Sequence, residues 1–349
     1  MVRRPPVVSV VIPCYNYARY LPACVDSVVE QAGVEVRVLI IDDSSTDDSS
    51  AIAEELARRD ARVATRRHAE NRGHIATYNE GLLEWADGDY VVLLSADDLL
   101  APGALGRAVD LMESHPRVGM VYGRSLDFSD DVPRVDHRFA GTTVHDGRRW
   151  LARRAREAAN VVSTPTAVVR TSVQRRVGGY DPELPHAGDF EMWLRVAGVA
   201  DVGYVRGSIQ AFYRVHPTSM SQQIYKDRLA DILQRRAVMD SIFSKHGDAL
   251  AAAGVARDAT YRTLASEPLW LACRAYEKGN ASQVPITEWV EFARQTHPDL
   301  GALPAYRALR RRQRLGERLC HRTQLFAVTT VVRRLQDLLW WERWKRFGG

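Results

Sequence analysis

Two pairs of adjacent aspartates have the residue type and spacing that metal-assisted chemistry needs. Asp42 and Asp43 directly follow one apolar run of the chain, and Asp97 and Asp98 follow another. Neighbouring carboxylates repel each other unless a positive group neutralises them. Mg²⁺ and Mn²⁺ favour one or two carboxylates together with the phosphate oxygens of a substrate. The pairs therefore predict a metal-assisted enzyme that acts on a nucleotide or a sugar diphosphate.

The first half of the chain alternates the patterns of buried strands and amphipathic helices. Continuous β-branched runs are typical of buried parallel strands, and apolar residues at helical spacing separate them. The predicted strands span 7–12, 36–41, 63–67 and 90–94, and the helices 21–29, 46–59, 75–86 and 102–115. Such units predict an α/β fold with a mostly parallel sheet flanked by helices. Ligands of such sheets bind at the carboxyl ends of strands, where both aspartate pairs lie.

The second half changes character along its length. Strands are predicted at 118–122 and 167–170, and the polar stretch 127–147, which Pro and Gly interrupt, is expected to be a loop over part of a site. After about Ser221 the strand patterns stop, and helices are predicted at 224–243, 249–265, 269–276, 286–294 and 303–344. We therefore predict a catalytic domain over residues 1–220 and a helical region over residues 221–349.

Composition places the chain among ordinary globular proteins. Of its 349 residues, 46% are hydrophobic and 26% are charged. No apolar stretch has the roughly 18 residues of a membrane span, and no apolar leader precedes the first strand. We expect a cytoplasmic protein whose cysteines are reduced thiols; these are Cys14, Cys24, Cys273 and Cys320.

The positive charge lies in the C-terminal tail. Residues 301–349 contain 12 Lys and Arg against 3 Asp and Glu, which leaves 36 against 40 elsewhere. An apolar stripe runs beside these basic residues, through Leu325, Val328, Val332, Leu335 and Leu339, and three tryptophans (Trp340, Trp341, Trp344) follow it. Such a helix can lie at the inner face of a membrane. The alternative, which the sequence favours, is a helix packed on the catalytic domain or across a homodimer. No nucleic-acid-binding module is recognisable, so nucleic acid is not an expected partner.

Three loops of the first half contain further candidate binding residues. Tyr15, two residues after Pro13, can stack on a base, or it can simply pack in a turn. Asp43 can accept hydrogen bonds from a base or a ribose, and capping of the next helix is an equal alternative. Asn71 and Gly73 belong to a turn that does not by itself require a functional role.

Two candidates for the chemistry itself lie in the second half. Asp189 starts an amphipathic helix, where a carboxylate is either a cap or a general base that reaches into a cleft. His216 lies in a loop and can serve as a metal ligand or a diphosphate donor, although a single loop histidine is more often neither.

The order of these motifs is more specific than any one of them. The blocks are V-S-V-V-I-P-C-Y-N at 8–16, I-I-D-D-S-S-T-D at 40–47, N-R-G at 71–73, L-L-S-A-D-D at 93–98, G-G-Y-D at 178–181, G-D-F-E-M-W-L-R at 188–195 and Y-R-V-H-P at 213–217. The set resembles the family 2 glycosyltransferases over roughly the first two thirds of the chain. The resemblance implies a Rossmann-like GT-A fold and inverting transfer from a UDP-, dTDP- or GDP-sugar, assisted by Mn²⁺ or Mg²⁺. The implied acceptor is a small molecule, a glycan or a lipid-linked molecule.

The resemblance also implies a role for each matching residue. It assigns Asp189 as the catalytic base, Asp98 as the metal ligand and His216 as a residue near the metal or diphosphate. The donor nucleotide is assigned to Pro13, Tyr15, Asp43, Asn71, Gly73 and Asp97, with Arg72 uncertain.

Two positions depart from the family pattern, and rival functions remain. Ser95 replaces the first Asp of the usual D-x-D, and Gly188 replaces the Glu that usually precedes the base. A non-catalytic nucleotide-sugar-binding homologue and a sugar nucleotidyltransferase are the alternatives, although the Gly-rich basic loop of the latter is missing. A dehydrogenase is excluded because G-x-G-x-x-G does not follow the first strand.

Overall fold

The computed structural model describes residues 4–135, 138–217, 219, 228–323 and 325–348. The chain forms two compact units: one comprises Met1–Leu151, Asn160–Gln223 and Lys345–Gly349, and the other comprises Ala152–Ala159 and Ile224–Trp344. The domain boundary predicted at residues 220–221 lies outside the described residues.

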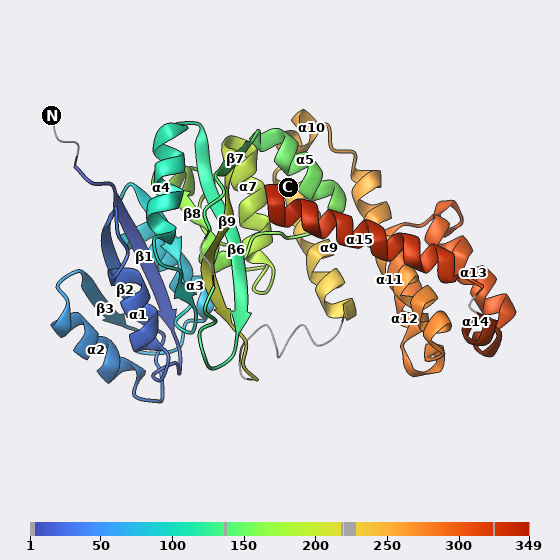
Figure 1. The fold of residues 1–349 in the computed structure, drawn as a ribbon, viewed down its shortest axis with the longest axis horizontal. Helices are drawn as coiled ribbons and strands as arrows, with labels where there is room; N and C mark the ends of the chain where they lie inside the picture. The colour runs from blue at the N-terminus through green and yellow to red at the C-terminus, as the bar shows by residue number, and fades with distance from the viewer. Residues whose placement is uncertain (1–3, 136–137, 218, 220–227, 324, 349) are drawn as a thin grey trace. The chain divides into compact units, whose positions relative to one another are not determined.

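A mixed β-sheet forms the centre of the first unit (Figure 1). Its strand order is β3-β2-β1-β4-β8-β6-β9-β5, with β7 paired to β9. The four strands at one side, β3, β2, β1 and β4, are all parallel, whereas β8, β5 and β7 pair antiparallel with their neighbours. The strands span Val7–Cys14 (β1), Glu35–Asp42 (β2), Val63–Arg67 (β3), Tyr90–Leu93 (β4), Leu99–Leu100 (β5), Val118–Phe128 (β6), Thr142–His145 (β7), Val168–Arg170 (β8) and Asp201–Arg214 (β9).

Helices cover both faces of this sheet, as the strand–helix alternation predicts. Successive residues of a strand point to opposite faces, and Val8, Val10 and Ile12 of β1 share a core with α1, α2 and α4. On the other face Val11 packs so tightly against Gly81 that an added Cβ would lie 2.2 Å from it. The helices of this unit are α1 (Leu21–Val29), α2 (Ser49–Arg59), α3 (His74–Asn79) with a π-helical continuation (Glu80–Trp85), α4 (Ala104–Ser114), α6 (Thr171–Val177) and α7 (Gly188–Val199); α5 (Gly147–Glu157) runs across the division.

The middle of the chain contains more strand than the sequence analysis expected. β6 continues to Phe128, and β7 occupies part of the stretch expected to be a loop. The 14-residue β9 was missed because buried polar side chains interrupt its apolar pattern. Gln210, for example, is 1% exposed, donates to the Ala104 carbonyl at 3.0 Å and accepts from Arg107 at 2.9 Å.

The second unit is helical, and its helix boundaries differ from those expected. Helix α11 runs unbroken through Pro268, where the sequence suggested two helices, because the proline is buried and packing outweighs its missing N–H. The stretch 303–344 contains three helices, and the first ends at Gly316, whose φ of 80° favours glycine. The helices are α9 (Arg228–Lys245), α10 (Gly247–Ala252), α11 (Arg257–Lys278), α12 (Ile286–Thr296), α13 (Pro304–Leu315), α14 (Glu317–Thr323) and α15 (Ala327–Phe347). Among the described residues, no helix combines the length and apolarity needed to span a bilayer.

Candidate functional site

Both aspartate pairs lie at one edge of the sheet, because the strands that precede them are parallel. Asp42 is the last residue of β2, and Cys14, its partner in register, is the last residue of β1. Asp97 and Asp98 follow β4 in the turn that leads to β5. Both pairs therefore lie at the carboxyl end of the parallel strands, as the sequence analysis expected.

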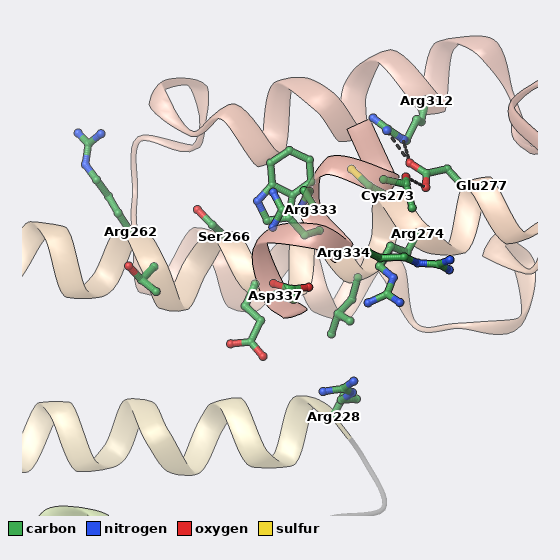
Figure 2. A pocket seen from close by; sticks show the side chains of 15 residues that line it. Arg228, Arg262, Ser266, Cys273, Arg274, Glu277, Arg312, Arg333, Arg334 and Asp337 are labelled. Atoms are coloured by element: carbon green, nitrogen blue, oxygen red, sulfur yellow. Dashed lines mark hydrogen bonds and ion pairs between the residues drawn. The ribbon is translucent and has the colours of Figure 1, made fainter. Parts of the chain in front are cut away.

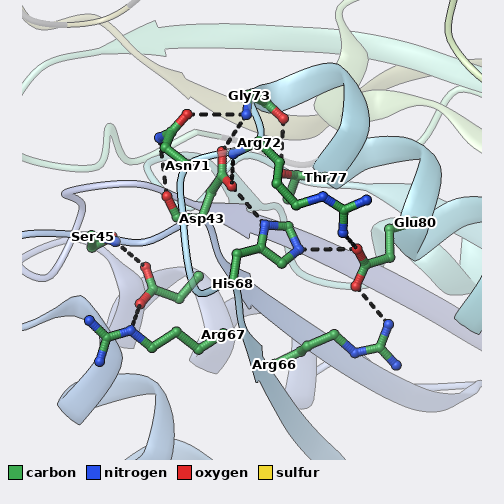
Figure 3. Close-up of polar contacts among 11 residues, drawn as sticks. Asp43, Ser45, Arg66, Arg67, His68, Asn71, Arg72, Gly73, Thr77 and Glu80 are labelled. Atoms are coloured by element: carbon green, nitrogen blue, oxygen red, sulfur yellow. Dashed lines mark hydrogen bonds and ion pairs between the residues drawn. The ribbon is translucent and has the colours of Figure 1, made fainter.

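Asp43 forms the centre of a buried hydrogen-bond network (Figure 3). Its Oδ1 accepts from the Arg72 backbone N–H at 2.8 Å and lies 2.7 Å from His68 Nδ1, and its Oδ2 accepts from the Gly73 N–H at 2.9 Å. The Asn71 amide donates to the Asp43 carbonyl at 3.1 Å. Asp43 therefore holds the Asn71–Gly73 turn in place and does not cap α2. The structure brings together three predicted donor-binding residues, whose role toward a nucleotide stays a prediction.

His68 and Glu80 complete this network, and the sequence analysis assigned neither a role. His68 Nε2 lies 3.0 Å from Glu80 Oε2, so each ring nitrogen faces a carboxylate. Burial opposes the charge on Glu80, but hydrogen bonds from Arg66 and His68 outweigh it and lower the Glu80 pKa. Arg72 adds a third contact at 2.6 Å. No local motif marks His68, because its partners are 25 and 12 residues away.

The loop after β1 presents Tyr15 to solvent. Asn16 adopts a left-handed conformation with a φ of 60°, and its side-chain oxygen accepts from the Thr46 N–H at 2.8 Å. This contact ties the loop after β1 to the loop after β2. Tyr15 is 46% exposed and Pro13 is half-buried, so the Tyr15 ring is free of the core and accessible to a base.

The end of β9 clamps the Asp97–Asp98 turn. The Arg214 N–H donates to Asp98 Oδ1 at 2.8 Å, and the Arg214 guanidinium donates to the Asp97 carbonyl at 2.9 Å. His216 Nε2 lies 3.0 Å from Asp97 Oδ2. The predicted partners Asp97, Asp98 and His216 therefore come together, although 116 or more residues separate the strand ends that carry them.

Burial shifts the pKa of both carboxyl groups in this turn. Burial, followed by the neighbouring Asp97 charge, raises the pKa of Asp98 well above its usual value. Burial also raises the pKa of Asp97, although His216 and Arg214 oppose that change. Asp98 Oδ2 is buried without a hydrogen-bond partner. Within the described ranges, no three His, Cys, Asp or Glu side chains are arranged to hold an ion by themselves.

Asp189 lies in the first turn of α7, where neighbouring side chains fix its carboxylate. Its Oδ2 accepts from Asn160 Nδ2 at 2.8 Å and from Thr164 Oγ1 at 3.3 Å, and its Oδ1 accepts from the Phe190 N–H at 2.7 Å. The N-cap residue of α7 is Ala187, so Asp189 is not the cap. Burial raises the pKa of Asp189, and the three hydrogen bonds oppose this change only in part.

Helix α3 holds the loop that leads to Asp189. Asn79 accepts from the Tyr180 N–H at 2.6 Å and donates to the Tyr180 carbonyl at 2.9 Å, and His74 contacts the Pro185 carbonyl at 2.7 Å. Gly179 is required here, because an added Cβ would lie 2.3 Å from the Asn79 side chain. The same helix follows Gly73, so it connects the Asp43 network to the Asp189 loop.

Tyr78 of α3 lies within electrostatic reach of both acidic groups. Burial is the main cause of its raised pKa, and the next causes are the charges of Asp97 and Asp189, with Asp98 also contributing. The Tyr78 ring also packs edge-on against the ring of Tyr180, in the loop that leads to Asp189.

The structure also explains one of the two departures from the family pattern. Gly188 is buried, and an added Cβ would lie 3.2 Å from the Tyr180 ring, so a larger residue would crowd that ring. Ser95 contributes its backbone carbonyl, which accepts from the Asp98 N–H at 3.0 Å and stabilises the turn. Nothing in the structure shows what the Ser95 side chain does.

Comparison with known proteins places this geometry among sugar-transferring enzymes. The model of glycosyl transferase family 2 matches residues 9–176. The uncharacterized glycosyltransferase EpsJ of Bacillus subtilis is 30% identical over 245 residues, which cover 69% of this chain and 70% of EpsJ. Several other curated relatives are much longer than the matched part, since this chain spans between 19% and 62% of their length.

Solved structures show a similar fold at low sequence identity. TarS of S. aureus matches with a TM-score of 0.56 and 18% identity, over 87% of this chain and 55% of TarS. The mannosyltransferase PcManGT of Pyrobaculum calidifontis, solved with GDP-Man and Mn²⁺, matches with a TM-score of 0.51 and 19% identity, over 85% of this chain and 88% of that one. The GT-A fold expected from the sequence is thus confirmed.

Proposed function

The chain is a glycosyltransferase that belongs to family 2, and we propose that it transfers a sugar from a nucleotide-diphosphate sugar to an acceptor hydroxyl or amine. The observation that carries this proposal is the Asp97–Asp98 turn after β4, in which Arg214 and His216 hold the two residues and Asp98 Oδ2 is buried without a hydrogen-bond partner. The Asp97–Asp98 turn supplies carboxylates suited to a cation-bound diphosphate, and Asp189 supplies a candidate base.

The donor is expected to be a UDP-, dTDP- or GDP-sugar. TarS has been solved with UDP and with UDP-GlcNAc, and PcManGT with GDP-Man. In this chain the exposed Tyr15 ring and the Asn71–Gly73 turn, held by Asp43, are placed to border a base and a ribose. Asp97 is assigned to the ribose and Asp98 to the metal.

The residues of the acidic turn fit a divalent cation. Asp98 has a buried oxygen without a partner, its pKa is raised, and two carboxyls with an incoming diphosphate form the oxygen donor set that Mn²⁺ and Mg²⁺ prefer. Asp98 would hold the ion, with His216 beside it. When bound, such an ion supplies Lewis-acid neutralisation of the leaving diphosphate. Arg214 keeps the turn in position through both of its contacts.

Asp189 is proposed to take the proton from the acceptor. Asn160 and Thr164 both donate to Oδ2, which orients the carboxylate and leaves the Oδ1 edge with a single N–H donor. A single base that assists a direct displacement predicts inversion at the anomeric carbon, by the geometric argument used for inverting glycoside hydrolases.

A donor screen tests the transfer proposal. We expect one class of nucleotide sugar to raise the melting temperature in the presence of Mn²⁺, because a ligand at 100 times its Kd stabilises the native state by about 2.7 kcal/mol. The same donor should release its nucleoside diphosphate only when the protein is present. A panel of UDP-, dTDP- and GDP-sugars that neither stabilises the protein nor is consumed with candidate acceptors would contradict the proposal.

The exposed surface of the C-terminal helix suggests that the protein binds its acceptor at a membrane. The stripe predicted for the tail is exposed on α15: Val328 is 77%, Leu335 53% and Leu339 70% exposed, and Leu325 precedes the helix. Basic residues lie on the same helix, among them the exposed Arg343. A helix of this composition suits peripheral contact with the anionic inner face of a membrane and so a lipid-linked acceptor, with a helix packed on the catalytic domain or across a homodimer as the alternative.

Vesicle binding separates these alternatives for α15. The double variant Leu335→Glu/Leu339→Glu should lose co-sedimentation with phosphatidylglycerol vesicles. Leu233→Glu should not, because Leu233 is also exposed (46%) but lies on α9. The membrane proposal is wrong if wild-type protein does not bind vesicles and sediments as a dimer, whereas the double variant sediments as a monomer. That result would support the homodimer.

A further inference from the structure

The helical unit contains a cavity of about 560 Å³ with an excess of arginine in its walls (Figure 2). Side chains from α9, α11, α13 and α15 line it. Three acidic residues, Glu267, Glu277 and Asp337, also belong to the lining. The six arginines are Arg228, Arg262, Arg274, Arg312, Arg333 and Arg334.

Two of the three acidic groups are already neutralised. Glu277 Oε1 accepts from Arg312 Nη2 at 2.6 Å, and its other oxygen accepts from the Thr330 hydroxyl. Glu267 accepts from Arg235, which is not part of the lining, at 2.8 Å. These carboxylates therefore add little negative charge to the cavity.

The remaining cations have few partners. Within the described part of the chain, no ion pair or hydrogen bond engages Arg228, Arg274 or Arg334; Arg262 pairs with Asp258, outside the lining. The Arg333 guanidinium lies over the Trp270 ring at 3.7 Å.

Arg333 lies close enough to Arg274 and Arg312 to be affected by their charges. Burial lowers its pKa; Asp337 opposes this change, and the charges of Arg274 and Arg312 reinforce it. Like charges kept together around a cavity attract a multivalent anion, because the anion relieves their mutual repulsion.

We propose that this arginine-lined cavity binds a ligand that carries two or more phosphate groups. Guanidinium groups bind phosphate through two parallel N–H donors, and three arginines have unengaged donors here. Thr263 and Ser266 add hydroxyls to the lining, and Trp270 adds an aromatic surface. A phosphate carries up to two charges and three acceptor oxygens, so two or three phosphates match the unneutralised arginines. The site lies in the helical unit and does not depend on the proposed donor chemistry.

Calorimetry with inorganic tripolyphosphate tests the cavity on the full chain. Wild-type protein should bind it with a Kd that rises steeply with salt, and Arg274→Ala/Arg334→Ala should weaken binding by about tenfold or more, since hydrogen bonds to charged groups are individually strong. The matched control is Arg311→Ala/Arg318→Ala, two exposed arginines of α13 and α14 outside the cavity, which should bind as wild type does. Asp98→Asn should also leave this binding unchanged, which separates the cavity from the donor site.

The binding experiments can overturn the proposal of a phosphate-binding cavity. Absent binding by the wild type, or an equal loss in the control pair, overturns the proposal. If Arg274→Ala/Arg334→Ala melts early, Arg228→Ala, at the exposed start of α9, provides the same test. A second experiment with phosphatidylglycerol vesicles identifies the source of the phosphate. If only the cavity variants lose vesicle binding, the ligand is a lipid head group. If they lose tripolyphosphate binding but keep vesicle binding, the ligand is a soluble compound.

Discussion

Replacement of Asp189 by Asn should lower kcat by about 100- to 10,000-fold, the usual value of a positioned general base. The Kd of the donor should change little, because the hydrogen-bond partners of Asp189 are Asn160, Thr164 and Phe190, none of which is assigned to the nucleotide. The amide keeps the shape of the carboxylate and an oxygen that can accept from Asn160. The measurement is single-turnover transfer with the donor that the screen selects, together with calorimetry of its nucleoside diphosphate.

The direction in which kcat changes with pH is an independent test of the role of Asp189. A base acts when it is deprotonated, so kcat should rise with pH through the Asp189 pKa, which burial places above the usual value of about 3.9. A raised folded-state pKa contributes stability that is complete below the unfolded pKa and is lost as pH rises through the folded one. Asn cannot ionise, so the variant should be no less stable than wild type at neutral pH, and its residual activity should lack the acid limb.

Asp110→Asn is the matched control for this substitution. It makes the same chemical change at an exposed residue of α4, outside the site. It should leave kcat, donor affinity and the acid limb as in wild type. An Asp189→Asn enzyme with near-normal turnover would remove Asp189 from the mechanism, and a parallel loss of donor affinity would assign it to binding.

The parts of the site that lie next to a strand end were predictable from sequence. A buried parallel strand is a continuous apolar run, and the residue after it must reach the sheet edge, so Asp43 and Asp98 could be placed by pattern alone. Asp189 was recognised by the motif around it, because a carboxylate at a helix start has capping as an equally simple explanation.

The supporting residues were not predictable, since their importance comes from contacts across the chain. His68 joins Asp43 to Glu80, and Asn160 orients Asp189 from 29 residues away. Neither residue has a repeating neighbour or an unusual spacing. Strand β9 was hidden for a related reason: buried polar groups such as Gln210 are satisfied by partners about 100 residues away, so the local pattern looks unlike a strand.

Helix α3 is in contact with the Asp43 network at one end and with the loop before Asp189 at the other. Asp43 fixes Gly73, which precedes α3, and Asn79 at the end of α3 fixes Tyr180 in the loop before Asp189. The short helix thus links the residues proposed to bind the donor to the loop before the proposed base. Its π-helical continuation begins at Glu80, the residue that pairs with His68, and π-helical turns often occur at functional sites.

Replacement of Asp98 should weaken metal-dependent donor binding. Asp98→Asn keeps an oxygen to accept the Arg214 N–H but removes the negative charge and the unpartnered carboxylate oxygen. We expect the affinity for UDP or GDP in the presence of Mn²⁺ to fall by about 10- to 100-fold. Mutation of a residue that only hydrogen-bonds a metal ligand has an effect of this size, so loss of the ligand itself should have at least this effect. The affinity in EDTA should be nearly equal for variant and wild type. Calorimetry with and without Mn²⁺ measures both.

Asp127→Asn separates direct coordination from a general loss of negative charge. Asp127 is exposed at the end of β6, and its charge is close enough to raise the Asp98 pKa, so its removal changes the local potential without touching the acidic turn. If Asp98 holds the cation, Asp127→Asn should change the Mn²⁺-dependent affinity by no more than a few-fold. Equal losses of Mn²⁺-dependent affinity in the two variants would show that the cation responds only to the negative potential at this end of the sheet and is not coordinated by Asp98. An unchanged affinity in Asp98→Asn would move the metal to other ligands, because the carboxylate oxygen that the fold leaves without a partner would then have no part in holding it.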